Sequence, residues 1–241
     1  MKIALIGYGK MGKTIEQIAL SKGHEIVARI DFNDELTIKT LNNVDVAIEF
    51  TQPASAPNNL IKCFDAGVPV VCGTTGWLSD YENIVAQCKD KKGSFFYASN
   101  YSLGVNIFFE INKRLAHIMN NYTQYEVSMT EIHHTQKLDA PSGTAITLAD
   151  DILKNLERKH QWVSIPTSDA RPLTSEDLVI ESKRKDPTPG THIVQYISEV
   201  DTIEISHTAH SRIGFAMGAL TAAEWIVGKK GVFGMKDLLG F

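Results

Sequence analysis

Two adjacent histidines and a lysine stand close together in the stretch EIHHTQKLDAPSGTA, which runs from Glu131 to Ala145. Histidine donates and accepts protons readily near neutral pH, so His133 and His134 are candidates for acid–base chemistry. The two lie at the end of an apparent strand, where neighbouring side chains point in opposite directions. Lys137 follows in a loop and adds a positive charge.

The same stretch continues into a helical pattern, DAPSGTAITLADDIL, which Ser142 is well suited to cap. Gly143 and Thr144 would then present free N–H groups of the first helical turn. Together with the helix dipole and Lys137, these groups predict an anion cradle, which suits a carboxylate better than a phosphate. Because zinc ligands at suitable spacing are missing nearby, no metal is predicted.

A glycine turn near the N-terminus predicts a dinucleotide site. Gly7, Gly9 and Gly12 follow a buried strand and open a helix, and Asp31 ends the next strand. Such a turn lets backbone approach a pyrophosphate, and the acid can bind the ribose hydroxyls. The alternative is a glycine turn that binds nothing.

The residues around Asp31 favour NADH as the cofactor. A carboxylate there repels the extra phosphate of NADP, and Phe32 supplies no compensating cation. Lys10, in the glycine loop, can reach toward either phosphate group, so NADPH or dual use stays open. Two later strand ends, CGTTGW and ASNYS, fall where open α/β sheets bind ligands and predict a nicotinamide pocket.

Strands and helices alternate up to about residue 102, which predicts a doubly wound parallel sheet, a Rossmann domain. Longer strand-like runs follow at 125–134 and in a hairpin turning near 199–201, with 164–190 expected to be a long loop that holds a short helix or strand at most. They predict an α+β domain with an open mixed sheet. We expect residues 1–102 and 213–241 to bind the dinucleotide, and residues 103–212 to bind substrate.

Composition narrows the class of protein. The net charge of −4 argues against a nucleic-acid partner, and three cysteines without metal spacing suit reduced thiols in a cytosol. The opening apolar run is too short for a signal peptide, and no stretch approaches a transmembrane length. We therefore expect a cytoplasmic protein without a membrane partner.

The stretch EIHHTQKLDAPSGTA resembles the E-x-H-H-x-x-K-x-D-A-P-S-G-T-A signature of the dihydrodipicolinate reductase family, also called 4-hydroxy-tetrahydrodipicolinate reductases. The resemblance covers nearly the whole chain and includes EFTQP, GTTGW, ASNYSLGVN and SHTAHSRIGFAMGA. Some members carry an acid followed by arginine at the second strand end, where this chain has Asp31 and Phe32. That difference bears on NADPH preference and not on the reaction.

The resemblance implies an NAD(P)H-dependent oxidoreductase that reduces 4-hydroxy-tetrahydrodipicolinate, or its dehydrated form, to tetrahydrodipicolinate in the diaminopimelate route of lysine biosynthesis. It implies His133 and Lys137 as catalytic residues and His134, Gly143 and Thr144 as substrate contacts. It also implies a homotetramer assembled through the open sheet of the second domain, residues 103–212. The implied cofactor contacts are Gly7, Tyr8, Gly9, Lys10, Met11, Gly12, Asp31, Gly73, Thr74, Thr75, Ala98, Ser99, Asn100 and Tyr101.

Three other readings of the sequence stay open. A different two-domain dehydrogenase would act on an amino or hydroxy acid and not on a cyclic imine. A nicotinamide-binding redox sensor would need a partner-binding element, and a zinc hydrolase would need bound metal. The sequence alone leaves the choice between NADH and NADPH, the substrate form, regulation, and the roles of His207, His210 and Arg212 undecided.

Overall fold

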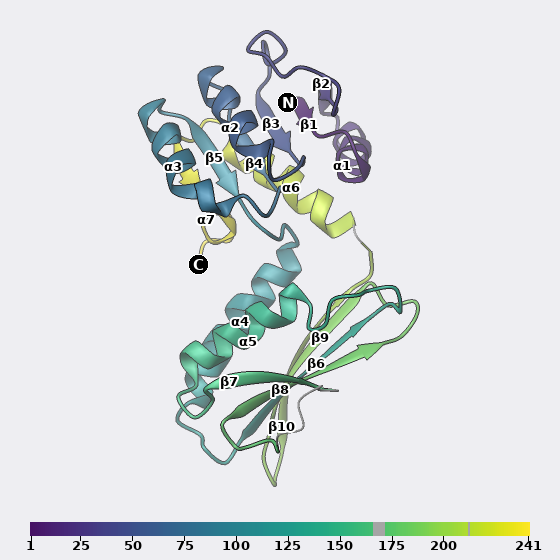
Figure 1. Cartoon of the computed structure of the whole chain (residues 1–241), viewed down its shortest axis with the longest axis vertical. Coiled ribbons are helices and arrows are strands. Elements are labelled where there is room, and N and C mark those ends of the chain that lie inside the picture. The colour runs from purple at the N-terminus through teal and green to yellow at the C-terminus, as the bar shows by residue number, and fades with distance from the viewer. Residues whose placement is uncertain (166–171, 212) are drawn as a thin grey trace. The chain divides into compact units, whose positions relative to one another are not determined.

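The computed structural model describes residues 1–165, 172–211 and 213–241, which form two compact units (Figure 1). Unit 1 comprises Met1–Leu103 and Ile213–Phe241, and unit 2 comprises Gly104–Arg212. Arg212, where the expected second domain ends, lies outside the described residues, as do residues 166–171 of the expected loop.

Unit 1 is built on one six-stranded sheet in the order β11-β5-β4-β3-β1-β2, with every adjacent pair parallel. The inner strands β1, β3, β4 and β5 are largely buried because both faces of the sheet are covered there, whereas the edge strand β2 alternates buried and exposed residues. Their bounds are β1 (Lys2–Ile6), β2 (Glu25–Ile30), β3 (Val46–Glu49), β4 (Val70–Cys72), β5 (Ser94–Tyr97) and β11 (Gly231–Phe233).

Helices cover both faces of this sheet. The apolar sides of α1 (Lys10–Ser21), α6 (Ile213–Ile226) and α7 (Met235–Leu239) pack in one core cluster. Those of α2 (Ala56–Asp65) and α3 (Tyr81–Asp90), which follows the short 3-10 helix η1 (Leu78–Asp80), pack in the other. The predicted doubly wound parallel sheet is confirmed, and strand order reverses between β1 and β3, where such folds bind ligands.

One strand of unit 1 was not expected from the sequence. The C-terminal run was predicted as helix, but β11 interrupts it and pairs in parallel with β5. Three residues, Gly-Val-Phe, are too short to show a strand period.

Unit 2 contains a five-stranded mixed sheet in the order β10-β9-β6-β8-β7. The central strand β6 pairs antiparallel with β9 and parallel with β8, so the predicted mixed sheet is confirmed. The strands are β6 (Glu126–His133), β7 (Gln161–Ile165), β8 (Asp177–Arg184), β9 (Gly190–Ile197) and β10 (Thr202–Ala209). The strand β8 lies in the segment expected to be a long loop with a short helix or strand at most, and its eight residues correct the expected length.

One face of the unit 2 sheet packs on α4 (Leu103–Met119) and α5 (Gly143–Asn155). Side chains alternate along β6, so Val127 and Met129 are buried while Ser128 and Thr130 are only half-buried. Glu131 and His133 continue this alternation, so their side chains are buried on the same helix-covered face.

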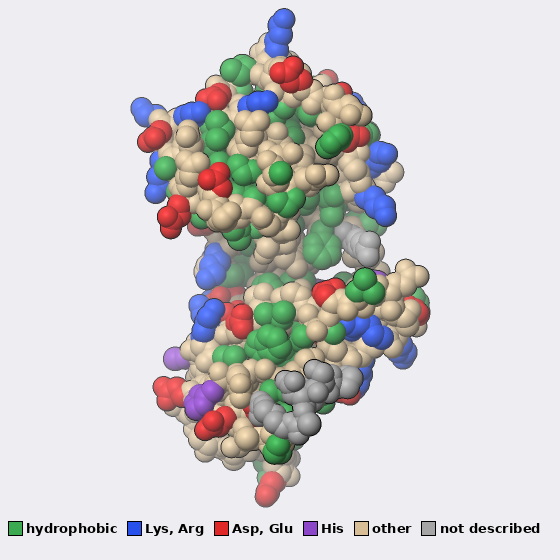
Figure 2. Space-filling view, in the orientation of Figure 1, with side chains coloured by type: hydrophobic (Ala, Val, Ile, Leu, Met, Phe, Trp, Pro, Cys, Tyr) green, Lys and Arg blue, Asp and Glu red, His purple; other side chains and the backbone are tan. Residues whose placement is uncertain are grey.

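The three cysteines are unpaired and buried. On the face drawn in Figure 2, acidic and basic side chains are interspersed without a broad region of one sign. Within the described residues, no helix combines the length and apolar character needed to cross a bilayer.

Replacing Gly218 by alanine should destabilise unit 1. A Cβ at Gly218, in α6, would lie 1.7 Å from the backbone oxygen of Tyr101, which cannot simply rotate away. Overpacking of this kind costs about 1–3 kcal/mol or more, so the urea midpoint should fall. Gly214→Ala in the same helix is the matched control, because its Cβ meets nothing within 4 Å. Equal midpoints for both variants would contradict this account.

Candidate active site

The glycine turn between β1 and α1 is fixed by steric necessity. Gly7 has a φ of +92°, and a Cβ there would lie 2.0 Å from the carbonyl oxygen of Phe50. A Cβ at Gly12 would lie 2.4 Å from the oxygen of Gly7. Only glycine lets this turn close against β3 and α1, which leaves α1 to begin at Lys10 with its first N–H groups facing outward from the sheet edge.

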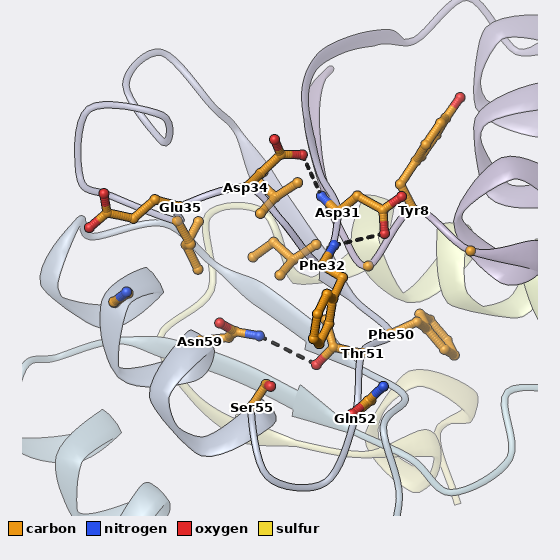
Figure 3. A pocket seen from close by; sticks show the side chains of 16 residues that line it. Tyr8, Asp31, Phe32, Asp34, Glu35, Phe50, Thr51, Gln52, Ser55 and Asn59 are labelled. Carbon is orange, nitrogen blue, oxygen red and sulfur yellow. Dashed lines mark hydrogen bonds between the residues drawn. The ribbon is translucent and has the colours of Figure 1, made fainter.

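A cavity of about 370 Å³ opens beside this turn (Figure 3). Gly7, Tyr8, Gly9 and Asp31, all predicted cofactor contacts, line it. Figure 3 shows Asp31 and Asp34 on one side of the cavity and Gln52, Ser55 and Asn59 on the other.

Acidic groups gather at the end of β2. Phe32 N–H donates to Asp31 Oδ1 at 2.8 Å, and Asp31 N–H donates to Asp34 Oδ2 at 2.8 Å. Glu35 also lines the cavity, and all three carboxylates belong to exposed residues. Among the described lining residues, Lys62 is the cation that faces these three acids.

The predicted contacts Gly73–Thr75 and Ala98–Tyr101 follow the ends of β4 and β5, on the same sheet edge but outside this cavity, and Lys10, Met11 and Gly12 lie on α1. A Cβ at Gly73 would lie 2.1 Å from the Phe50 ring. Thr74 is buried, and its Oγ1 accepts the N–H of Thr51 at 2.7 Å. Beyond them, Thr75 and Ser99 are exposed, Asn100 is half-buried and Ala98 is buried.

Tyr101 differs from the other predicted contacts. Its ring is buried, and its hydroxyl donates to the Cys72 carbonyl at 2.7 Å. Burial raises the pKa of this hydroxyl well above its usual value. Its side chain therefore ties the segment after β5 to β4, which leaves the backbone as the part available to a cofactor. Lys10 is exposed, and Met11 packs against the core.

In unit 2, the connection from β6 to α5 gathers the predicted proton donors and the anion cradle. Ser142 caps α5 as expected, with its Oγ accepting the N–H of Ala145 at 3.2 Å. The Ser142 N–H itself donates to Glu131 Oε2 at 2.9 Å. The first-turn N–H groups of Gly143 and Thr144 have no protein partner among the described residues.

Lys137 and His134 sit at the same connection. Both carboxylate oxygens of Asp139 accept from Lys137 Nζ at 2.7 Å, and this pairing lowers the pKa of Asp139. The Lys137 side chain is 20% exposed, whereas that of Asp139 is 64% exposed. The carboxylate that pairs with Lys137 is therefore open to solvent. His134 is half-buried and follows directly after β6, which ends at His133.

His133 lies in a buried cluster that the sequence did not reveal. Glu131 Oε2 lies 3.4 Å from His133 Nδ1 and 3.9 Å from His192 Nε2. His192 Nε2 is 3.0 Å from Ser142 Oγ, and the two imidazole rings meet edge to face at 5.1 Å. The register that sets Glu131 opposite His192 on β9 makes this cluster.

Burial and charge act against each other on these groups. Burial lowers the pKa of His133, while the Glu131 carboxylate raises it and Lys137 and Arg184 lower it further. For Glu131, burial raises the pKa, but hydrogen bonds from Ser142 and Ser182 outweigh burial and lower it overall. Burial lowers the pKa of His192 to about 4, so this ring is neutral at pH 7.

Several residues at these sites were missed by sequence reasoning. His192 carries no motif, and only the pairing of β6 with β9 brings it to Glu131. Phe50, Thr51 and Gln52 line the cavity in unit 1. They lie within the EFTQP motif, which contributed to the family resemblance but did not indicate a role for them. The cavity lining also includes further residues that the sequence did not indicate: Ile6, Ile30, Asp34, Glu35, Leu36, Ser55, Asn59 and Lys62.

Comparison with known proteins identifies similar sequences over nearly the whole chain. Family models for dihydrodipicolinate reductase match residues 1–101 with the N-terminal model and 104–239 with the C-terminal model. A 4-hydroxy-tetrahydrodipicolinate reductase of Christiangramia forsetii is 48% identical over 99% of this chain and 98% of its own length. One from Acinetobacter baumannii is 31% identical over 99% and 96%.

Solved structures show the same fold. A dipicolinate-bound dihydrodipicolinate reductase from Paenisporosarcina sp. TG-14 superposes with a TM-score of 0.78 at 21% identity, covering 98% of both chains. An amine dehydrogenase from Mycobacterium smegmatis superposes with a TM-score of 0.59 at 12% identity, covering 96% of this chain and 94% of that one.

Proposed function

Because this chain belongs to the dihydrodipicolinate reductase family, we propose that its two units divide the work of one reduction. The chain is an oxidoreductase that reduces 4-hydroxy-tetrahydrodipicolinate, or its dehydrated dihydrodipicolinate form, to tetrahydrodipicolinate in the diaminopimelate route of lysine biosynthesis. Unit 1 binds the nicotinamide cofactor, and unit 2 binds the substrate and supplies the proton.

The residues of unit 1 fit a dinucleotide. Neighbouring backbone oxygens leave no room for a Cβ at Gly7 or Gly12, so only glycine lets the turn close and start α1 at the sheet edge, where its first N–H groups can meet a pyrophosphate. Asp31 lines the adjoining cavity, where its carboxylate can accept hydrogen bonds from the ribose hydroxyls. The segments Gly73–Thr75 and Ala98–Tyr101 end neighbouring strands and would hold the nicotinamide end. When bound, NADH or NADPH supplies the hydride.

Unit 2 holds the dicarboxylate. A substrate carboxylate can accept hydrogen bonds from the free N–H groups of Gly143 and Thr144, where the α5 dipole adds favourable charge. Lys137 provides the cation, since its partner Asp139 is exposed and exchangeable. His134 lies beside this site and contacts the substrate.

His133 donates the proton that completes the reduction, with Lys137 as the second proton donor. One observation carries this assignment: the Ser142 N–H bonds to Glu131, and this ties the α5 N-terminus to the strand that bears His133. The carboxylate-binding groups and the proton donor therefore belong to one rigid piece of unit 2. This arrangement holds a substrate in a fixed pose next to the acid.

Dipicolinate binding tests the substrate site. Dipicolinate is a stable planar dicarboxylate, and it is bound in the Paenisporosarcina enzyme. Calorimetry should show binding by this chain, weakened by about tenfold or more in Lys137→Met, since a charge-assisted hydrogen bond contributes ~1.5–3 kcal/mol. Lys183→Met is the control, because Lys183 pairs with Glu181 on β8. Equal affinities of the two variants would reject the Lys137 assignment.

We also propose a preference for NADH, a cytoplasmic enzyme and a homotetramer. The three acids at the end of β2 support the first, and the buried free thiols suit a reducing compartment. The sheet face of unit 2 that α4 and α5 leave open carries exposed Ile197 and half-buried Ile132 and Ile193, which suits pairing with other copies. Sedimentation equilibrium at the mass of four chains is the expected result.

A further inference from the structure

We propose that Glu131 is a positioning residue for His133, whose ring it holds through Nδ1 and whose protonated form it stabilises by charge. The inference rests on the proposed function in one respect, the role of His133 as proton donor. The proposal adds a buried carboxylate that does not contact the substrate but determines whether His133 is protonated.

The carboxylate of Glu131 is built into the fold as an anion. Its side chain is buried, Oε2 accepts the Ser142 N–H at 2.9 Å, and Oε1 accepts the Ser182 hydroxyl at 2.9 Å. Arg184 Nη1 lies 3.5 Å from Oε1. Two hydrogen bonds and a nearby guanidinium offset the cost of burying the charge, so Glu131 stays ionised at neutral pH.

His133 is arranged to use this anion. Its Nδ1 is buried, has no hydrogen-bond partner of regular geometry, and lies 3.4 Å from Glu131 Oε2. This contact would become a hydrogen bond if the ring turned toward the carboxylate, and catalytic contacts often tighten when substrate binds. The other nitrogen, Nε2, faces Gly190, where a Cβ would lie 3.1 Å away, so glycine leaves room for the ring.

Most of the other influences on His133 oppose its protonation, which makes Glu131 decisive. Burial, Lys137 and Arg184 all lower the pKa of His133. Asp139 raises it, but this carboxylate is exposed and paired with Lys137. His192, across on β9, is neutral at pH 7 and adds no charge there. Glu131 is therefore the buried group that favours the imidazolium ion.

The same three side chains also meet the geometry of a metal triad, since ligand atoms of Glu131, His133 and His192 lie within 4.8 Å of one another. The hydrogen bonds argue for proton handling instead. Both carboxylate oxygens already accept protein donors, and His192 Nε2 is engaged with Ser142 Oγ. The Arg184 guanidinium beside Glu131 further disfavours a second cation.

The test is an NMR titration of His133 in the full chain labelled with ¹³Cε1-histidine, with the signal assigned by its loss in His133→Asn. In Glu131→Gln, which keeps the shape of the side chain and removes its charge, the pKa of His133 should fall by about one unit or more. Ser182→Ala is the matched control, because it removes one hydrogen bond to Glu131 and leaves the charge. It should change the pKa of His133 far less.

The pH dependence of turnover gives the second readout. A proton donor loses activity as pH rises through its pKa, so Glu131→Gln should move this decline to lower pH and lower kcat at pH 8 more than at pH 6. A purely structural role would lower kcat equally at both pH values.

An unchanged pKa of His133 in Glu131→Gln overturns the proposal. If that variant does not fold, Glu131→Asp provides the test. Its carboxylate lies one methylene farther from His133, so the pKa of His133 must fall by a smaller amount. An unchanged pKa in Glu131→Asp also overturns the proposal. The titration needs no turnover. Failure of the parent enzyme to reduce the imine would therefore reject the proposed function and leave this test standing.

Discussion

Replacing His133 by alanine lowers the turnover number by about 10²-fold or more, because a positioned general acid typically contributes 10²–10⁴-fold. The loss should appear in kcat with little change in the dissociation constant for dipicolinate, since the carboxylate-binding N–H groups on α5 remain. Stopped-flow and steady-state assays on the purified variant measure the first quantity, and calorimetry measures the second.

Two further variants sharpen this result. Lys137→Ala should lose a similar factor in kcat and also bind dipicolinate more weakly, since Lys137 is assigned to both proton transfer and the anion site. His160→Ala is the control, because this exposed histidine pairs with Glu176 before β7 and has no assigned role. Near-normal turnover in both His133→Ala and Lys137→Ala would refute the assignment of the proton donors.

NADH should support a kcat/KM at least about tenfold higher than NADPH, because the extra phosphate would meet the carboxylates at the end of β2. Asp31, Asp34 and Glu35 line this cavity, and Phe32 stands where a cation would be needed. The double change Asp31→Ser with Phe32→Arg should therefore raise kcat/KM for NADPH and lower it for NADH. Initial rates with each cofactor give the ratio.

A control for this exchange lies on the same strand. Glu25→Ser removes a carboxylate from the opposite end of β2, so the cofactor ratio should stay that of the parent enzyme. A parent enzyme that prefers NADPH would contradict the role given to Asp31 and would direct attention to Lys62, the cation in the same cavity.

The fold of unit 1 was predictable because its signals are local. Apolar runs such as Ile3–Ile6 and glycines at turns report strands and their ends within a few residues of sequence. The strands that were missed lack such signals. In β8, the apolar run Leu178–Ile180 is short and lies in a segment rich in turn-forming residues, and β11 has only three residues.

The candidate site was predictable only where its residues share one segment. The stretch from His133 to Thr144 showed the donors and the N-cap, and the structure puts them on one connection. The pairing across the sheet could not be predicted from the sequence. Glu131 and His192 are 61 residues apart, and only the register of β6 and β9 brings them together. The pairing of Lys137 with Asp139 depends on the conformation of a loop, which the spacing of hydrophobic residues in the sequence does not indicate.

A coupled absorbance assay tests the central claim most directly. The cyclic imine is generated in place from pyruvate and aspartate semialdehyde by the upstream synthase, and nicotinamide oxidation is followed at 340 nm. Our account predicts fast oxidation that requires both the synthase and this enzyme, with NADH the faster cofactor. Folded enzyme that binds NADH but shows no imine-dependent oxidation would contradict the assignment of the reaction to this chain.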